Sequence, residues 1–200
     1  ESSANCNTCK PREIRRLQRP VILFNLSPIH FSESGQKEIM VERIWLNHYP
    51  AGIPADIDVS QYSSVLDLFD EAIRKFADKP AFSNFGKNLS FAKLDLLSHR
   101  FASYLQELGS LTKGDRVAIM LPNLLQYPVV LFGILRAGLT VVNVNPLYTA
   151  RELEAQLKDS GAKAIIVLEN FAGTLQKVLG STSIEHVITS QVGDLLSAPK

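Results

Sequence analysis

The segment 133–149, GILRAGLTVVNVNPLYT, constrains the fold of this chain more strongly than any other stretch. It begins as the end of a helix, passes a turn at residues 137–138 that contains Gly138, and continues as an apolar run over 139–144. That run is rich in β-branched residues and shows no alternation with polar ones, which is typical of a strand covered on both faces of a sheet. We therefore expect a buried strand directly after a helix.

The loop after this strand leads into another helix. Asn145 and Pro146 end the strand, because proline has no N–H to contribute to a sheet. Thr149 is followed three residues later by Glu152, which is the spacing of a capping box at a helix N-terminus. A helix, a buried strand and a second helix in this order are the repeating unit of an α/β protein.

Strands and single helices alternate through the second half of the chain. Asn123 and Gln126 occupy the expected capping positions of one of these helices, and Gly161 is the expected stop of another. Strands separated by single helices of this length imply crossovers and a parallel sheet. The sequence thus predicts a doubly wound, mainly parallel α/β fold, with strands over 116–121, 139–144, 164–168 and 186–189 and helices over 124–136, 151–160 and 171–179.

A helix–hairpin–helix segment is expected before this sheet. Ser64 with Asp67 predicts a helix up to about residue 78, whose apolar side chains share one face. Two short strands about a turn at 85–87 follow, and Ser90 caps the next helix. Residues 40–62, rich in Pro, Gly and Asp, are interpreted as an extended arm over the surface.

The first 39 residues differ from the rest, since no helical or strand period persists in them. Cys6 and Cys9 form a CxxC pair that could be half a zinc site or a redox pair, but no second ligand pair accompanies it. We interpret 1–39 as a disordered or extraneous leader. The folded part is expected to begin at Met40.

Several function classes lack their sequence signatures. There is no GxxxxGK[ST] phosphate loop, no GxGxxG after a strand and no GxSxG nucleophile elbow. The glycines of 133–138 lie at the end of a helix and are interpreted as packing residues. The histidines show no metal-ligand spacing, the net charge of +1 gives no signal for nucleic acid, and no apolar run reaches membrane-spanning length.

Three stretches resemble one family closely. LSFAKL at 89–94, KGDRVAIMLPNLLQYPVVLFGILRAGLTVVNVNPLYTARELEAQLKDSGAKAIIV at 113–167 and the early YPAGIP resemble bacterial long-chain fatty acid–CoA ligases of the adenylate-forming superfamily. The resemblance runs from about Met40 to the end and implies that residues 40–200 are the N-terminal, incomplete part of the large adenylate-forming domain. It implies the N-terminal fragment of an enzyme that activates a fatty acid with ATP and Mg²⁺ to an acyl-adenylate and then transfers the acyl group to coenzyme A.

The resemblance also implies what this chain lacks. The family's phosphate loop, its nucleotide-binding motifs and its C-terminal domain with a catalytic lysine have no counterpart here, so we expect no catalytic or metal-binding residue and an inactive fragment. The alternative is a non-catalytic binding or regulatory module with the same fold. A cytoplasmic location is expected because no signal-peptide pattern is seen. Peripheral attachment to the inner face of the membrane and a homodimer are further expectations.

One candidate site follows from the fold. Ligands of doubly wound sheets bind beyond the carboxyl ends of the strands, where helix N-termini face the crevice. Residues 122–123, 145–149 and 169–171 lie at these ends. The resemblance implies that the second and third of these loops form a wall of the coenzyme A channel, with Asn145, Tyr148, Thr149 and Asn170 as its residues. Alternatively, these residues cap turns and helices, and Tyr148 covers the sheet edge.

Overall fold

The structure is a computed structural model that describes residues 43–196. These residues fall into two units divided between Ala55 and Asp56, and each unit is described by itself. The described part of the first unit contains the short 3₁₀ helix η1 (Ile44–His48), and the Arg43 guanidinium donates to the carbonyl of Ala55 at 2.8 Å. The predicted leader 1–39, with its cysteines, lies outside the described residues and stays a prediction.

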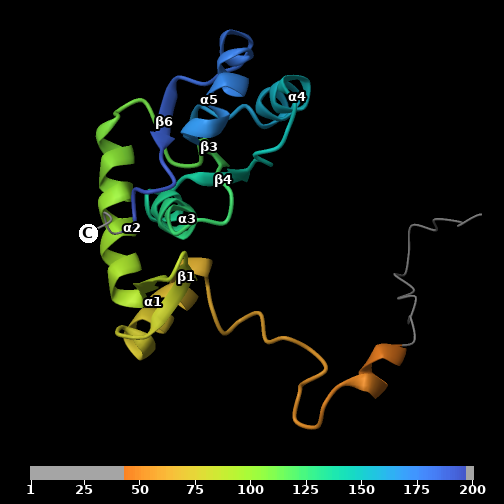
Figure 1. Cartoon of the computed structure of the whole chain (residues 1–200). Coiled ribbons are helices and arrows are strands. Elements are labelled where there is room, and N and C mark those ends of the chain that lie inside the picture. The colour runs from red at the N-terminus through yellow and green to blue at the C-terminus, as the bar shows by residue number, and fades with distance from the viewer. Residues whose placement is uncertain (1–42, 197–200) are drawn as a thin grey trace, which may run out of the picture. The chain divides into compact units, whose positions relative to one another are not determined.

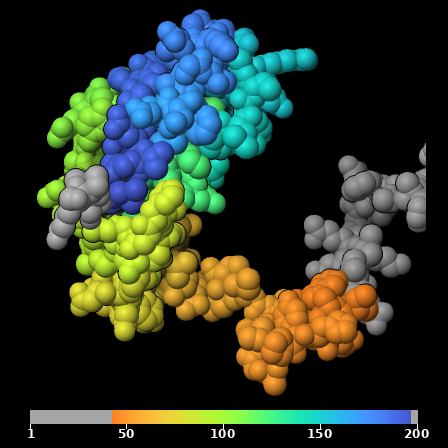
Figure 2. Space-filling model, viewed as in Figure 1, coloured from red at the N-terminus to blue at the C-terminus, as the bar shows by residue number. Residues whose placement is uncertain are grey.

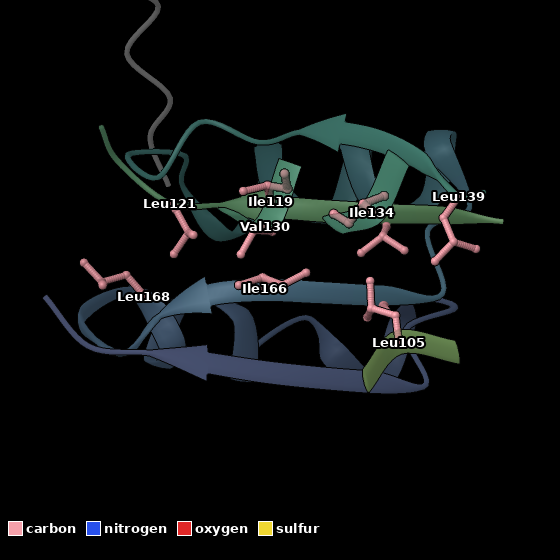
Figure 3. Close-up of a cluster of buried hydrophobic side chains, with 10 residues drawn as sticks. Leu105, Ile119, Leu121, Val130, Ile134, Leu139, Ile166 and Leu168 are labelled. Atoms are coloured by element: carbon pink, nitrogen blue, oxygen red, sulfur yellow. The ribbon is translucent and has the colours of Figure 1, made fainter. Parts of the chain in front are cut away.

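The second unit contains the predicted parallel sheet. All pairings in this four-stranded sheet are parallel, and the four arrows of Figure 3 point the same way. Each strand is joined to the next in sequence by one of the helices α3 (Gln126–Arg136), α4 (Ala150–Ser160) and α5 (Glu169–Gln176). The strand order across the sheet is β4 (Thr140–Asn143), β3 (Arg116–Met120), β5 (Ala164–Leu168) and β6 (His186–Ser190).

Helices cover both faces of this sheet (Figure 1). On one face, α3 and α2 (Phe91–Glu107) pack on Ile119 and Ile166 through Val130, Ile134 and Leu105 (Figure 3). On the other face, α4 and α5 lie side by side (Figure 2). They cover a second apolar cluster. The doubly wound prediction is therefore confirmed.

The helix–hairpin–helix segment also forms as predicted. It consists of α1 (Val65–Phe76), the antiparallel strands β1 (Pro80–Asn84) and β2 (Lys87–Ser90), and α2. The Ser64 and Ser90 hydroxyls cap the two helices by accepting hydrogen bonds from backbone amides. The hairpin turn is shorter than expected, because Phe85 and Gly86, both with positive φ, connect the strands without Lys87. A third apolar cluster joins this segment to the outer face of α3.

The prediction of a fully buried strand over 139–144 is only partly right. Both faces of β4 are covered, since Val141 packs on the cluster with α2 and α3 and Val142 on the cluster with α4 and α5, but the strand is not buried along its length. Within residues 43–196 it lies at the edge of the sheet, with β3 as its strand neighbour. Thr140 and Asn143 are exposed, and the two valines between them are half-buried. The strand buried along its whole length is β5. Composition indicated that 139–144 was apolar, but strand order depends on long-range pairing, which local composition does not encode.

Two helix starts also differ from the prediction. Helix α3 begins at Gln126 without a side-chain cap, so neither Asn123 nor Gln126 caps it. Helix α5 begins at Glu169, directly after the last residue of β5, and Asn170 therefore lies within its first turn rather than in a loop. By contrast, Thr149 caps α4, and Gly161 ends it in the left-handed conformation, both as predicted.

Candidate ligand-binding edge of the sheet

The carboxyl ends of the four parallel strands meet at one edge of the sheet. From β3 the chain moves to β4 on one side, and from β4 it crosses to β5 on the other side of β3. This reversal makes the gap between β3 and β5 the topological switch point, where ligands of such sheets usually bind.

The chain itself bridges this switch point. The Gln126 side chain, buried at the start of α3 in the connection after β3, donates to the Gln191 carbonyl at 2.6 Å. The Gln191 side chain in turn donates to the Glu169 carboxylate, which follows β5, at 2.9 Å. Gln126 and Asp194 also line a mainly apolar cavity of about 200 Å³. The segment after β6 thus connects the starts of α3 and α5, the helices that follow β3 and β5.

The loop after β4 is shaped by its own hydrogen bonds. The Val144 amide donates to the Ile119 carbonyl and so extends the sheet pairing by one residue. The Asn145 side-chain oxygen accepts from the Leu147 amide at 3.0 Å, and the Asn145 carbonyl accepts from the Tyr148 amide at 3.1 Å. Asn145 therefore forms this turn, which is the role that the alternative to a channel residue gave it.

The N-terminus of α4 carries its own carboxylate. Glu152 accepts from the Thr149 amide at 2.9 Å and from the Thr149 hydroxyl at 2.8 Å. The bond from the Thr149 amide is the main cause that lowers the pKa of the Glu152 carboxyl below its ordinary value. Glu152 is consequently ionised at neutral pH, and an anionic ligand at this helix end would be repelled by it and would compete with it for the same donors.

Tyr148 packs on the apolar cluster beneath α4 and α5 and borders a pocket of about 450 Å³. Glu152, Gln156 and Asp159 line the same pocket. Two carboxyl-bearing residues make this pocket unfavourable for phosphate groups. It is better suited to a neutral ligand with amide donors and apolar segments.

The predicted site residues are only partly brought together. Asn145, Tyr148 and Thr149 share the loop after β4, whereas Asn170 follows β5. Strand β3 lies between β4 and β5, so the two groups start about 10 Å apart across the sheet. Asn170 is exposed on the first turn of α5. The structure therefore separates Asn170 from the other three residues by the width of one intervening strand.

Sequence reasoning missed three residues next to this loop. Tyr127 donates from its hydroxyl to the Asn143 side-chain oxygen at 2.8 Å, and the Gln156 amide donates to the Asn143 carbonyl at 2.8 Å. Tyr127 comes from α3, Asn143 from β4 and Gln156 from α4. Their spacing in the sequence follows no helical or strand period, so no local signal could have identified them.

Two of the described histidines have side-chain partners. His99 pairs with Asp95 on the surface of α2, and His186 hydrogen-bonds Ser110. Across residues 43–196 no group of three or more His, Cys, Asp or Glu side chains could hold a metal ion. The helices of the same region are all too short or too polar to cross a bilayer.

Comparison with known proteins agrees with this architecture. A family model described as AMP-binding enzyme matches residues 69–199. A long-chain-fatty-acid–CoA ligase of Salmonella typhimurium is 58% identical over 160 residues, which cover 80% of this chain and 28% of that protein. The ligase of the same name from Bacillus subtilis is 38% identical over 159 residues, with the same coverage of both proteins.

Solved structures share the fold as well. The long-chain-fatty-acid-CoA ligase of Archaeoglobus fulgidus has a TM-score of 0.57 at 28% identity and covers 62% of this chain and 26% of its own. A benzoate CoA ligase of Burkholderia xenovorans LB400 has a TM-score of 0.58 at 26% identity and covers 62% of this chain and 25% of its own.

The fold and the solved neighbours define an α/β architecture shared with CoA ligases. Because the family model spans more than half of its length, this chain belongs to the AMP-binding enzyme family. The chain spans 28% of the length of the two curated relatives named above.

Proposed function

We propose that this chain is part of a long-chain fatty acid–CoA ligase. The observation that carries the proposal is its identity of 58% over 160 residues with the Salmonella ligase. In the proposed reaction, a fatty acid carboxylate attacks the α-phosphorus of ATP and releases pyrophosphate. The thiol of coenzyme A then attacks the acyl carbon of the acyl-adenylate, and AMP leaves.

The described residues contain no cluster that could hold Mg²⁺. The proposal assigns no step of the adenylation to this chain, as the family resemblance implies. The proposal places the ATP and Mg²⁺ sites, and the catalytic residues, in parts of a longer protein. On this view the 200-residue chain is an inactive N-terminal fragment that contributes one wall of the site.

For coenzyme A, the proposal keeps Asn145, Tyr148, Thr149 and Asn170 as residues of a channel wall. The carboxylates beside Tyr148 disfavour the phosphorylated nucleotide end of coenzyme A at this pocket. The neutral, slender pantetheine arm fits the same surface better, because it presents amide groups and apolar segments. Cytoplasmic location, peripheral membrane attachment and homodimer formation remain predictions for the longer protein.

The test uses the full-length protein encoded by the gene from which this chain derives. Purified protein is incubated with oleate, ATP and coenzyme A, and oleoyl-CoA, AMP and pyrophosphate are measured by mass spectrometry. We expect the three products in equal amounts. Turnover with acetate or benzoate but not with oleate would contradict the proposed substrate class. No carboxylate-dependent AMP formation at all would favour the non-catalytic module instead.

A further inference from the structure

Asn143 is held from both faces of the sheet at the point where β4 ends. From the α3 face, the Tyr127 hydroxyl donates to its side-chain oxygen. From the α4 face, the Gln156 amide donates to its backbone carbonyl. We call these three residues the Asn143 clamp. The clamp connects α3 and α4, which lie on opposite faces of the sheet, through the last residue of β4.

The clamp acts where the sheet is least supported. Within the described residues β4 is an edge strand, and Asn143 is exposed. An edge strand has one row of backbone groups without a strand partner. Gln156 satisfies the Asn143 carbonyl in place of a neighbouring strand. The two clamp bonds therefore restrain the backbone immediately before the loop 144–149.

The orientation of Gln156 is determined by this contact. Its amide nitrogen bonds the Asn143 carbonyl, whereas its side-chain oxygen is buried and has no hydrogen-bond partner among the described residues. Turning the amide over would place two acceptor oxygens against each other, so the side chain cannot relieve the unpaired oxygen in that way. An unsatisfied buried acceptor is unfavourable, and its presence beside Tyr148 indicates that the contact with Asn143 dominates at this position.

We propose that Tyr127 and Gln156 are positioning residues that act through Asn143 to place the loop 144–149 and thereby Tyr148. This inference rests on the proposed function for its ligand, since it assigns the clamp to the step that binds the pantetheine arm of coenzyme A. The clamp residues touch neither the acyl group nor the nucleotide in this proposal. Tyr127 sets the affinity for coenzyme A through the geometry of the loop, whereas Gln156 also lines the pocket proposed for the pantetheine arm.

The first test is independent of any activity. Hydrogen–deuterium exchange is measured on the 200-residue chain and on its Tyr127→Phe variant, which loses one hydroxyl and keeps the ring packing. The amides of Asn145, Leu147, Tyr148 and Thr149 should exchange at least fivefold faster in the variant, while those of β5 stay unchanged. Tyr104→Phe, on α2 with a half-exposed side chain, is the matched control. Unchanged exchange at 145–149, or an equal rise throughout, would overturn the positioning role.

Gln156→Met is the second variant, because it keeps the length of the side chain and removes the donor. If Tyr127→Phe does not fold, this variant decides the same question by the same measurement. If the amides of this loop exchange in Gln156→Met at the same rate as in the wild type, the clamp is refuted.

The second test uses the full-length protein. For Tyr127→Phe we expect KM for coenzyme A to rise five- to tenfold, with oleate-dependent ATP–pyrophosphate exchange unchanged. Equal losses in both half-reactions, or an unchanged KM, would overturn the assignment to coenzyme A. A wild-type protein without ligase activity would refute the proposed function, and the exchange of residues 145–149 would still decide the positioning role.

Discussion

Gly133 allows α3 to approach α2 closely. A Cβ atom at this position would lie 2.7 Å from the Phe101 ring and 3.1 Å from the Ser98 carbonyl. We expect Gly133→Ala to lower the free energy of unfolding by about 1–3 kcal/mol, since the core would be overpacked. Urea titration followed by circular dichroism measures this. Gly173→Ala, in α5 with nothing within 4 Å, should be neutral or stabilising by about 0.5–1 kcal/mol. A smaller loss of unfolding free energy in Gly133→Ala than in Gly173→Ala would contradict the packing role of Gly133.

A variant of Tyr148 tests whether this residue lines the proposed coenzyme A channel or only supports the framework of the sheet edge. In the full-length protein, Tyr148→Ala should weaken thioester formation more than adenylate formation, because the side chain is proposed to contact coenzyme A alone. The two half-reactions are measured separately, by oleoyl-CoA formation and by pyrophosphate exchange. Leu147→Ala, at an 80% exposed neighbour, is the control. Equal losses in both half-reactions, or lower thermal stability alone, would make Tyr148 a framework residue.

At the level of elements, Arg136 joins three helices. Its guanidinium lies 2.9 Å from Asp70 of α1 and 2.7 Å from Asp95 of α2, and it is placed over the Phe69 ring at 5.3 Å. The arginine is 10% exposed, while the two carboxylates are 43% and 33% exposed and thus partly screened. We expect Arg136→Lys to destabilise the chain by roughly 1–3 kcal/mol, since lysine cannot bridge both carboxylates with one planar group.

The control for Arg136 is an exposed ion pair on one helix. Lys158 and Glu154 pair across one turn of α4 and are 53% and 34% exposed. Lys158→Gln should therefore cost less than about 0.5 kcal/mol. Both variants are compared by urea unfolding. Similar losses of unfolding free energy for the two substitutions would show that the Arg136 bridge between helices stabilises the fold no more than a surface ion pair does.

Asp115 links the starts of β3 and β5 and predicts a pH dependence. Its carboxylate accepts from the Thr112 amide and from the Lys163 ammonium, each at 2.8–2.9 Å. These contacts, the Thr112 amide first, lower the pKa of Asp115 from 3.8 to about 2. A carboxyl with a depressed folded-state pKa stabilises the fold above pH 4, and this stabilisation disappears as the pH falls toward 2.

The corresponding variant is Asp115→Asn. Its unfolding free energy should fall below that of the wild type at pH 6, and the difference should shrink between pH 4 and pH 2. Urea titrations across this range measure it, with Asp78→Asn in an exposed turn as the control for losing one charge. A difference independent of pH would mean that ionisation of Asp115 does not contribute.

At the scale of the whole molecule, we expect the 200-residue chain to fold but to have no adenylation activity. The purified 200-residue chain should show no oleate-dependent ATP–pyrophosphate exchange, because adenylation needs donors for the polyphosphate and a positioned carboxylate. The full-length protein, assayed in parallel, provides the positive control. Exchange above background by the short chain would place an adenylation site within it and refute the proposed division.

The local elements were predictable because their signals are short-range. The caps at Ser64, Ser90 and Thr149 each depend on one side chain and an amide three residues away. The candidate site was predicted less well. Three of its residues share a loop, but Asn170 lies on a helix after another strand, and the Asn143 clamp was missed. Caps are encoded within four residues, whereas the clamp joins residues whose proximity depends on how the sheet is assembled.

The sequence by itself determined the order of strands and helices, the parallel sheet and the family resemblance, since these follow from hydrophobic period, capping spacing and motif. The tertiary structure alone decided that β4 lies at the edge while β5 is fully buried. It also decided that Gln126 holds the segment after β6 instead of capping α3. The physical reason is the same in both cases. Strand neighbours and side-chain partners far apart in the chain are selected by packing of the complete unit, and no local pattern of residues specifies them.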